Sequence, residues 1–199
     1  MGLAQHYLED IAKEQEGFRQ VLELYFSNGQ YREPRILSIC SGVANEEPLL
    51  KNHFGENSEL ISLDNNPHLE IFWRELGRKS VQIRDVRELY KHVRGKFNLV
   101  VGRNVPLNPN YRSLMKKVPD CWPRVFEDLI EFMESDYTLF LTVVRGDEFD
   151  RAKEILDNTG YRIEVKERNQ IVVPSDYIGI AGSDTKDHYV IVAQPPFKI

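Results

Sequence analysis

Apolar positions follow a helical period at the start of the chain and then change to short runs. Over residues 3–28 they recur three or four residues apart, which predicts one amphipathic helix that ends at Asn28-Gly29. Beyond it, short apolar runs predict strands over 36–40, 59–63, 80–83, 97–101 and 138–144. The stretches between them predict helices over about 46–54, 68–76, 86–94 and 121–134, and we expect Asp147 to cap a helix that ends near 158.

Strands that alternate with helices predict parallel βαβ units in one doubly wound α/β domain. The tail differs, because two further strands over 161–166 and 188–193 flank a stretch that carries Pro174, Gly179 and Gly182. With no crossover helix between them, the last strand should run antiparallel to its neighbour. We therefore expect a single domain over 1–199, with a helical cap (1–34) and a mostly parallel seven-stranded core (35–199).

Composition places the chain among ordinary globular proteins. It has 199 residues, of which 41% are hydrophobic and 29% charged, and no apolar run approaches the ~20 residues that span a bilayer. The N-terminus is polar rather than signal-like, so we expect a cytoplasmic protein without membrane association. Cys40 and Cys121 lie far apart and are interpreted as reduced thiols.

The charge argues against a broad nucleic-acid surface, because the formal net charge is −5. A local basic patch remains open, and a solvated surface is the simpler interpretation of the same residues. The patch would contain Arg112, Lys116, Lys117 and Arg124.

The loop after the first strand is the first candidate site, since doubly wound sheets bind ligands beyond the carboxyl ends of their strands. It reads Cys40-Ser41-Gly42-Val43-Ala44. The small residues Ser41, Gly42 and Ala44 would let the backbone approach a ligand closely. A plain strand-to-helix turn needs small residues as well.

Two acidic residues follow the next strands. Asp64, with Asn65 beside it, comes 22 positions after Gly42 and is placed to accept the hydroxyls of a ribose. Asp64 is also typical of a turn, because Asn65, Asn66 and Pro67 follow it. Asp85 could meet the amine of an adenine, or it could cap a helix with Glu88 three residues later.

The loop, Asp64, Asp85 and the run Phe97-Asn98-Leu99-Val100-Val101-Gly102-Arg103-Asn104 appear in an order that resembles the class I, Rossmann-like S-adenosylmethionine-dependent methyltransferases. The reversed last strand fits as well, and the resemblance spans roughly 35–194. It implies S-adenosylmethionine as cofactor and S-adenosylhomocysteine as product. It also implies a role for each segment: the backbone of 40–44 at the methionine part, Asp64 and Asn65 at the ribose, Asp85 and Val86 at the adenine, and Arg103 and Asn104 near the transferable methyl group.

The chain departs from that pattern in the first loop. Ser38 stands where the family usually has an acidic residue, and of three positions that are commonly glycine only Gly42 is glycine, with Cys40 and Ala44 at the others. This motivates an alternative, a binding or interaction module of the same fold without transfer activity. A nicotinamide-dependent oxidoreductase fits less well, because it expects Gly-x-Gly-x-x-Gly here.

No catalytic residue is assigned from the sequence. Methyl transfer can rest largely on positioning, and no histidine lies at a convincing strand end. No cluster with metal-ligand spacing is present, so we expect no metal. The sequence does not identify the methyl acceptor. We expect residues 105–124 to contact it. The polar residues near strand ends are Glu46, Arg103, Asn104, Tyr111 and Arg145.

Overall fold

A computed structural model gives the fold of the chain. It describes residues 2–26, 31, 33–41, 46–78, 81–83, 85–107, 120–171, 173–174 and 185–196, with only the backbone described for residues 2–11, 72, 81, 83, 90, 92, 132, 173–174 and 185–186.

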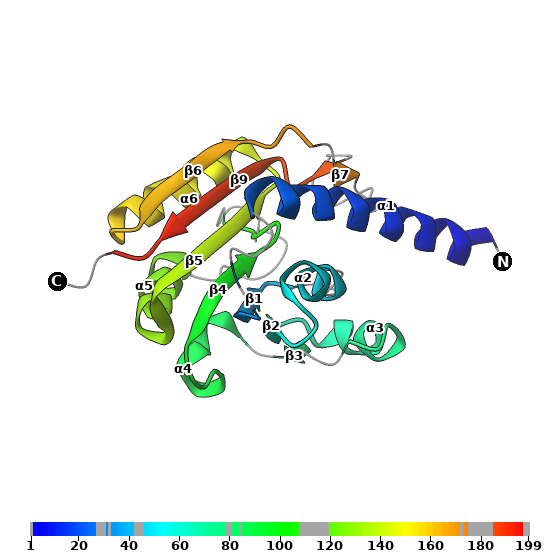
Figure 1. Cartoon of the computed structure of the whole chain (residues 1–199), viewed down its shortest axis with the longest axis horizontal. Helices are drawn as coiled ribbons and strands as arrows, with labels where there is room; N and C mark the ends of the chain where they lie inside the picture. Colours follow the sequence, from blue (N-terminus) through cyan, green and yellow to red (C-terminus); the bar gives the residue numbers. More distant parts are fainter. Residues whose placement is uncertain are drawn as a thin grey trace.

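Seven strands of the described residues form one sheet in the order β3-β2-β1-β4-β5-β9-β6 (Figure 1). The strands from β1 to β5 pair in parallel, whereas β9 is antiparallel to both β5 and β6. This confirms the predicted α/β class, with its mostly parallel sheet and reversed last strand. The strands are β1 (Arg35–Ile39), β2 (Glu59–Asp64), β3 (Val81–Ile83), β4 (Phe97–Gly102), β5 (Met133–Val143), β6 (Arg162–Arg168) and β9 (Tyr189–Gln194).

Helices follow the strands as the pattern predicts. They are α1 (Gly2–Tyr25), α2 (Glu47–Phe54), η1 (Pro67–Leu69), α3 (Glu70–Glu75), η2 (Val86–Glu88), α4 (Leu89–His92), α5 (Trp122–Phe132) and α6 (Gly146–Asn158). Between β6 and β9, the short strands β7 (Val173–Pro174) and β8 (Thr185–Lys186) pair with each other.

Two local predictions were wrong. Arg145 rather than Asp147 occupies the N-cap of α6, and Asp147 lies in the first turn. There it complements the helix dipole and accepts a 3.0 Å hydrogen bond from Nε of Arg145. In addition, β5 begins at Met133, directly after α5, rather than at Thr138. Residues 134–136 are polar and at least partly exposed, so the apolar run that indicates a strand begins only after them.

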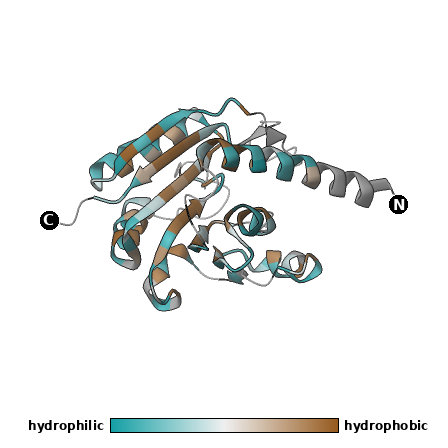
Figure 2. Cartoon of the chain, viewed as in Figure 1, coloured by the Kyte–Doolittle hydropathy of each residue, from teal (hydrophilic) through white to brown (hydrophobic). Residues whose placement is uncertain are grey.

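Each face of the sheet has its own core. On one face, α1 and α2 bury Phe18, Leu22 and Leu50 against β1, β4 and β5, and on the other, α4, α5 and α6 pack on Leu37 and Val100. Figure 2 shows that β9 is largely hydrophobic and that β5 is hydrophobic toward its C-terminal end. Consecutive residues of a strand therefore point to different helices, which places Ser38 on the α1 and α2 face together with Ile36.

The C-terminal part of helix α1 lies across the sheet, and its N-terminal part extends beyond the other elements (Figure 1). Among the described residues, no helix combines the length and the apolar character needed to cross a membrane.

Candidate functional site

The carboxyl ends of four parallel strands meet at one edge of the sheet. The register places Ile39 of β1 beside both Leu63 of β2 and Gly102 of β4, and Asp64 beside Ile83 of β3. Because the strand order reverses between β1 and β4, this edge is the switch point of the sheet. The loop after β1, the end of β2 and the residues after β3 and β4 therefore begin side by side, as the sequence predicts.

The described start of the first loop is fixed against β2. Cys40 has a φ of +56°, in the left-handed region that glycine usually occupies, and the backbone N–H of Ser41 donates to the carbonyl of Leu63 at 3.2 Å. Ser41 is buried, yet its hydroxyl makes no hydrogen bond to any residue that the structure describes. Since buried polar groups are normally hydrogen-bonded, this hydroxyl fits a polar ligand. Gly42 and Ala44 lie outside the described residues.

Asp64 and Asn65 end the second strand with a turn. Oδ1 of Asp64 accepts a 2.9 Å hydrogen bond from the N–H of Asn66, whose own side chain caps η1. Asp64 is half-buried and Asn65 exposed, so both lie at the surface of this edge. Turn formation and the predicted ribose contact are compatible, because a carboxylate has several acceptor positions.

Asp85 follows β3 and caps η2. Its Oδ1 accepts a 2.9 Å hydrogen bond from the N–H of Arg87, and its carboxylate also binds the Arg87 guanidinium. Val86, the next residue, is half-buried and packs against the core. The carboxylate thus has a structural role, and the predicted adenine contact would fall to the backbone of 85–86.

Arg103, directly after β4, lies in a buried ion-pair network. Nη1 contacts Oε1 of Glu14 on α1 at 2.6 Å, Nη2 contacts Oδ2 of Asp187 at 2.7 Å, and the guanidinium stacks 4.2 Å above the ring of Phe18. Burial alone would lower the Arg103 pKa, but the charges of Asp187 and Glu14 outweigh it and hold the pKa above its ordinary value. The side chain of Arg103 therefore ties α1 and the start of β9 to the end of β4.

Asn104 continues this network through its backbone and its amide. It has a φ of +52°, its N–H donates to Oγ1 of Thr142 at 2.9 Å, and its Oδ1 accepts from the N–H of Asp187 at 2.9 Å. Thr142 also donates directly to Asp187. The turn after β4 is thus held rigidly at the edge where the sequence predicts the methyl group.

A buried carboxyl lies beneath the first loop. The hydroxyl of Ser38 donates to Oε1 of Glu46 at 2.9 Å, and both side chains are buried. Burial raises the pKa of Glu46 to about 7; the charge of Arg103 opposes the shift, and that of Glu14 adds to it. Glu46 is therefore a group that can change its charge near neutral pH.

The sequence interpretation named Glu46 only as one polar residue near a strand end, and it missed Glu14 and Asp187. Glu14 gave a signal, because it falls on the apolar stripe of α1 four residues before the buried Phe18. Asp187 gave none that a sequence pattern could reveal.

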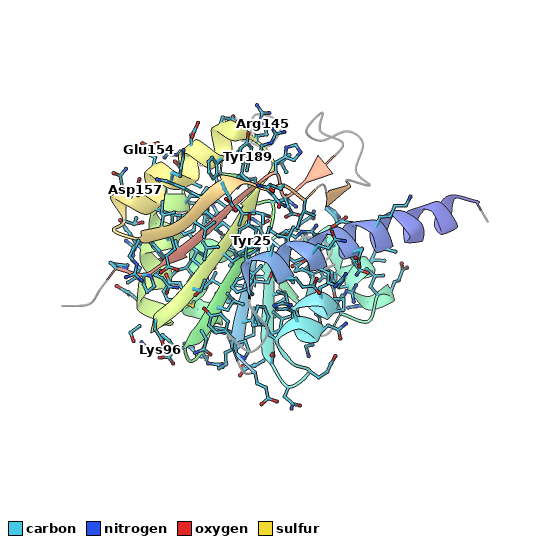
Figure 3. All side chains as sticks on the ribbon, turned by 45° about the horizontal axis from the view of Figure 1, so that its top comes forward. Tyr25, Lys96, Arg145, Glu154, Asp157 and Tyr189 are labelled. Atoms are coloured by element: carbon cyan, nitrogen blue, oxygen red, sulfur yellow. The ribbon has the colours of Figure 1, made fainter. Side chains whose placement is uncertain are left out.

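The other candidates lie apart from this cluster or outside the described residues. Arg145 is exposed, pairs with Asp147, and lies with Tyr189 near the end of β5, whereas Lys96 lies at the opposite end of the sheet (Figure 3). Tyr111 and the basic residues 112–117 lie outside the described residues. In the part of the chain that the structure describes, no group of three or more His, Cys, Asp or Glu side chains could hold a metal ion.

Comparison with known proteins gives matches among solved structures. No protein-family model matches the sequence, and no curated protein does. The precorrin-6y C5,15-methyltransferase of Geobacter metallireducens matches with a TM-score of 0.60 and 14% identity, over 90% of this chain and 87% of that one. The ribosomal protein L11 methylase of Lactobacillus delbrueckii matches with a TM-score of 0.58 and 11% identity, over 89% and 77%. The chain has the class I methyltransferase fold.

A third match, with this same methyltransferase fold, is magnesium protoporphyrin IX methyltransferase from Synechocystis, solved with bound S-adenosylmethionine. It has a TM-score of 0.56 and 12% identity, over 98% of this chain and 85% of that one. The resemblance inferred from the sequence is therefore confirmed for the fold, which the chain follows from its N-terminal helix to its reversed last strand.

Proposed function

We propose that this chain binds S-adenosylmethionine at the edge formed by the ends of β1, β2 and β3 and transfers its methyl group to an acceptor. One observation carries the proposal. The left-handed turn at Cys40-Ser41 is hydrogen-bonded to the end of β2, next to Asp64, and holds a buried hydroxyl that has no hydrogen-bond partner among the described residues. A methyltransferase fold with these features at its switch point supports a nucleoside cofactor there.

Each part of the cofactor would contact residues at the end of a different strand. Cys40 and Ser41, with the rest of the loop, would hold the methionine part, and Asp64 with Asn65 would hold the ribose. The backbone at 85–86 would meet the adenine.

The turn after β4 would lie near the methyl group. Arg103 would contribute there through its backbone, because its guanidinium is held by Glu14 and Asp187. Its role is then to fix the wall of the site, and Asn104 shares that role through its bond to Asp187.

The cofactor supplies an activated methyl group when it is bound. The protein's part is to orient the acceptor and to exclude water, and positioning of this kind can provide most of the acceleration. The similar structures are named for a ribosomal protein, a precorrin and a magnesium protoporphyrin, so the fold is compatible with very different acceptors. A screen in a cytoplasmic extract should therefore include proteins, nucleic acids and small molecules.

Isothermal titration with S-adenosylmethionine and S-adenosylhomocysteine tests the proposal. We expect binding of both, and about 10- to 100-fold weaker binding to Asp64→Ala, because a hydrogen bond to a charged group contributes about 1.5–3 kcal/mol. The matched control is Asp150→Ala, an exposed aspartate of α6 away from this edge.

Failure of the folded protein to bind either ligand would refute the proposal. Equal affinity in Asp64→Ala would refute the assigned site. Binding without transfer of a labelled methyl group to any fraction of the extract would favour the binding module instead.

A further inference from the structure

The side-chain amide of Asn104 has a fixed orientation at the end of β4. Its Oδ1 accepts a 2.9 Å hydrogen bond from the backbone N–H of Asp187. The reversed orientation would place the NH2 group of the amide against that N–H, so two donors would face each other and the bond would be lost. The amide oxygen therefore faces Asp187, and the NH2 group lies on the other side of the amide.

The backbone of Asp187 is itself held on several sides. Its residue is fully buried, Arg103 and Thr142 donate to its carboxylate, and Nδ2 of Asn169 donates to its backbone carbonyl at 3.0 Å. The backbone N–H of Asn104 in turn donates to Oγ1 of Thr142 at 2.9 Å. Both the backbone and the amide oxygen of Asn104 are thus anchored, and its NH2 group remains for a ligand.

The NH2 group belongs to the ligand edge of the sheet. Asn104 is half-buried, and no described residue accepts a hydrogen bond from its Nδ2. The turn begins after Gly102, which the register places beside Ile39, and Ile39 leads into the Cys40-Ser41 turn of the proposed cofactor site. With the cofactor bound as proposed, two N–H donors in a fixed plane lie beside its methyl group.

We propose that Asn104 selects the methyl acceptor: its NH2 group donates a hydrogen bond to an ionised oxygen, so the methyl group is transferred to an oxyanion and not to an amine. The inference rests on the proposed function and adds to it the chemical class of the acceptor. An oxyanion has lone pairs both for this hydrogen bond and for the new bond to carbon. An amine that directs its lone pair at the methyl group turns its own N–H donors outward, where Asn104 offers donors again.

Transfer to an oxyanion is balanced without a base. A lone pair of the oxygen forms the new O–C bond while the C–S bond breaks, and the electron pair of that bond stays on sulfur as the thioether of S-adenosylhomocysteine. The negative charge of the oxygen and the positive charge of the sulfonium cancel, and no proton is released. A hydroxyl or an ammonium group would also have to lose a proton to a base within hydrogen-bond reach.

Nuclear magnetic resonance of the side-chain amides tests the proposal without turnover. In the isotope-labelled protein saturated with S-adenosylhomocysteine, the Asn104 amide signals are identified by their loss in Asn104→Gly. We expect acetate, as the oxyanion probe, to shift these signals, and methylammonium at the same concentration to leave them unchanged. The amide of Asn98 is the internal control, because its Oδ1 also accepts from a backbone N–H, that of Arg35 at 3.1 Å, toward the opposite end of β4.

Two substitutions separate the proposed role from a structural one. Asn104→Asp keeps an oxygen for the N–H of Asp187 but replaces the NH2 group with a second oxygen. Asn104→Gly removes the whole amide, and glycine suits the φ of +52° at this position. An amide that only holds Asp187 predicts better transfer by Asn104→Asp than by Asn104→Gly. The proposed contact predicts the opposite order, because a carboxylate repels an oxyanion.

Transfer to the labelled fraction of the extract gives that order. We expect kcat/KM to fall about 10- to 100-fold in Asn104→Gly and further in Asn104→Asp, while the affinity for S-adenosylhomocysteine changes less than about 3-fold in either variant. Asn98→Asp is the matched control and should leave both quantities unchanged.

The methylated atom itself gives the third readout. After transfer of a deuterated methyl group, mass spectrometry of the labelled acceptor locates that group on oxygen or on nitrogen, and we expect oxygen. Alkali distinguishes two sources of an oxyanion in the same sample. A carboxylate acceptor yields an ester that alkali cleaves to methanol, and a phenolate yields an ether that alkali leaves intact.

Three results would each overturn the selection of an oxyanion and leave the proposed function intact. They are a methyl group on an amine nitrogen, an Asn104 amide signal that does not respond to acetate, and better transfer by Asn104→Asp than by Asn104→Gly. Absence of S-adenosylmethionine binding by the wild type, or binding without any labelled acceptor, would overturn both the transfer and this inference.

Discussion

Replacing Glu46 with glutamine should make the protein more stable at alkaline pH than the wild type. Glutamine has the size of glutamate and can still accept the hydrogen bond from Ser38 through its amide oxygen. It cannot carry a charge. The substitution therefore removes one buried titration and keeps the packing.

The magnitude follows from the two pKa values of Glu46. In the unfolded chain it titrates near 4.5, and in the folded protein burial raises the pKa to about 7. Between these values the folded state holds the proton more tightly, so its stability falls as the pH rises, and the full cost is present above pH 7. At about 1.4 kcal/mol per pH unit, the separation corresponds to about 3 kcal/mol.

Urea unfolding of both proteins at several pH values from about 5 to about 8 measures this cost. All other groups titrate in both proteins, so the difference between their free energies of unfolding isolates Glu46. We expect that difference to move by about 2–3 kcal/mol in favour of Glu46→Gln as the pH rises. The exposed Glu131→Gln on α5 is the control and should follow the wild type. Parallel curves for Glu46→Gln and wild type would show that Glu46 titrates normally in the folded protein, and the reasoning from its burial would be wrong.

Three further substitutions test the frame around the site by urea unfolding. Arg103→Met should cost about 3–5 kcal/mol, because it leaves buried carboxylates without their cation, and a loss under 1 kcal/mol would contradict the network. Gly102→Ala should cost about 1–3 kcal/mol, since its Cβ would lie 2.7 Å from side-chain atoms of Leu141 and Val105; a neutral effect would mean that the edge can relax. Cys40→Val should be less stable than Cys40→Gly by about 1–3 kcal/mol, because a β-branched residue is strained at a φ of +56°, and the reverse order would refute the left-handed turn.

The period of the apolar residues was sufficient to predict most helices and strands, because each of them buries one face. The stripe of α1 and the short apolar runs of β1, β2 and β4 report burial directly, and the parallel order with a reversed last strand followed from the missing crossover helix. The errors arose where local patterns compete. The start of β5 is polar and directly follows an amphipathic helix, and Asp147 has the chemistry of a cap although it lies in the first turn of α6.

The polar cluster could not be predicted in the same way. Arg103 meets Glu14 and Asp187 across separations of 89 and 84 residues. No local pattern encodes such contacts, since they depend on α1 crossing the sheet edge and on β9 returning beside β5. Only the charge of Glu14 on an apolar stripe indicated that a buried partner was needed.

The structure changes the interpretation of the two residues near the first loop that depart from the methyltransferase pattern. The sequence lacks a glycine at position 40, yet Cys40 adopts the left-handed conformation that glycine would provide. It also lacks an acidic residue at position 38, yet Glu46 brings a carboxylate to the Ser38 hydroxyl. Position 40 thus has the backbone conformation typical of glycine, and position 38 has a carboxyl group as its hydrogen-bond partner. The altered residues were the reason to consider a module without transfer activity, and the geometry at these two positions bears on ligand binding rather than on transfer. A left-handed φ at Cys40 and a buried carboxyl at Glu46 are both destabilising, and we predict that a bound ligand offsets their cost whether or not transfer follows.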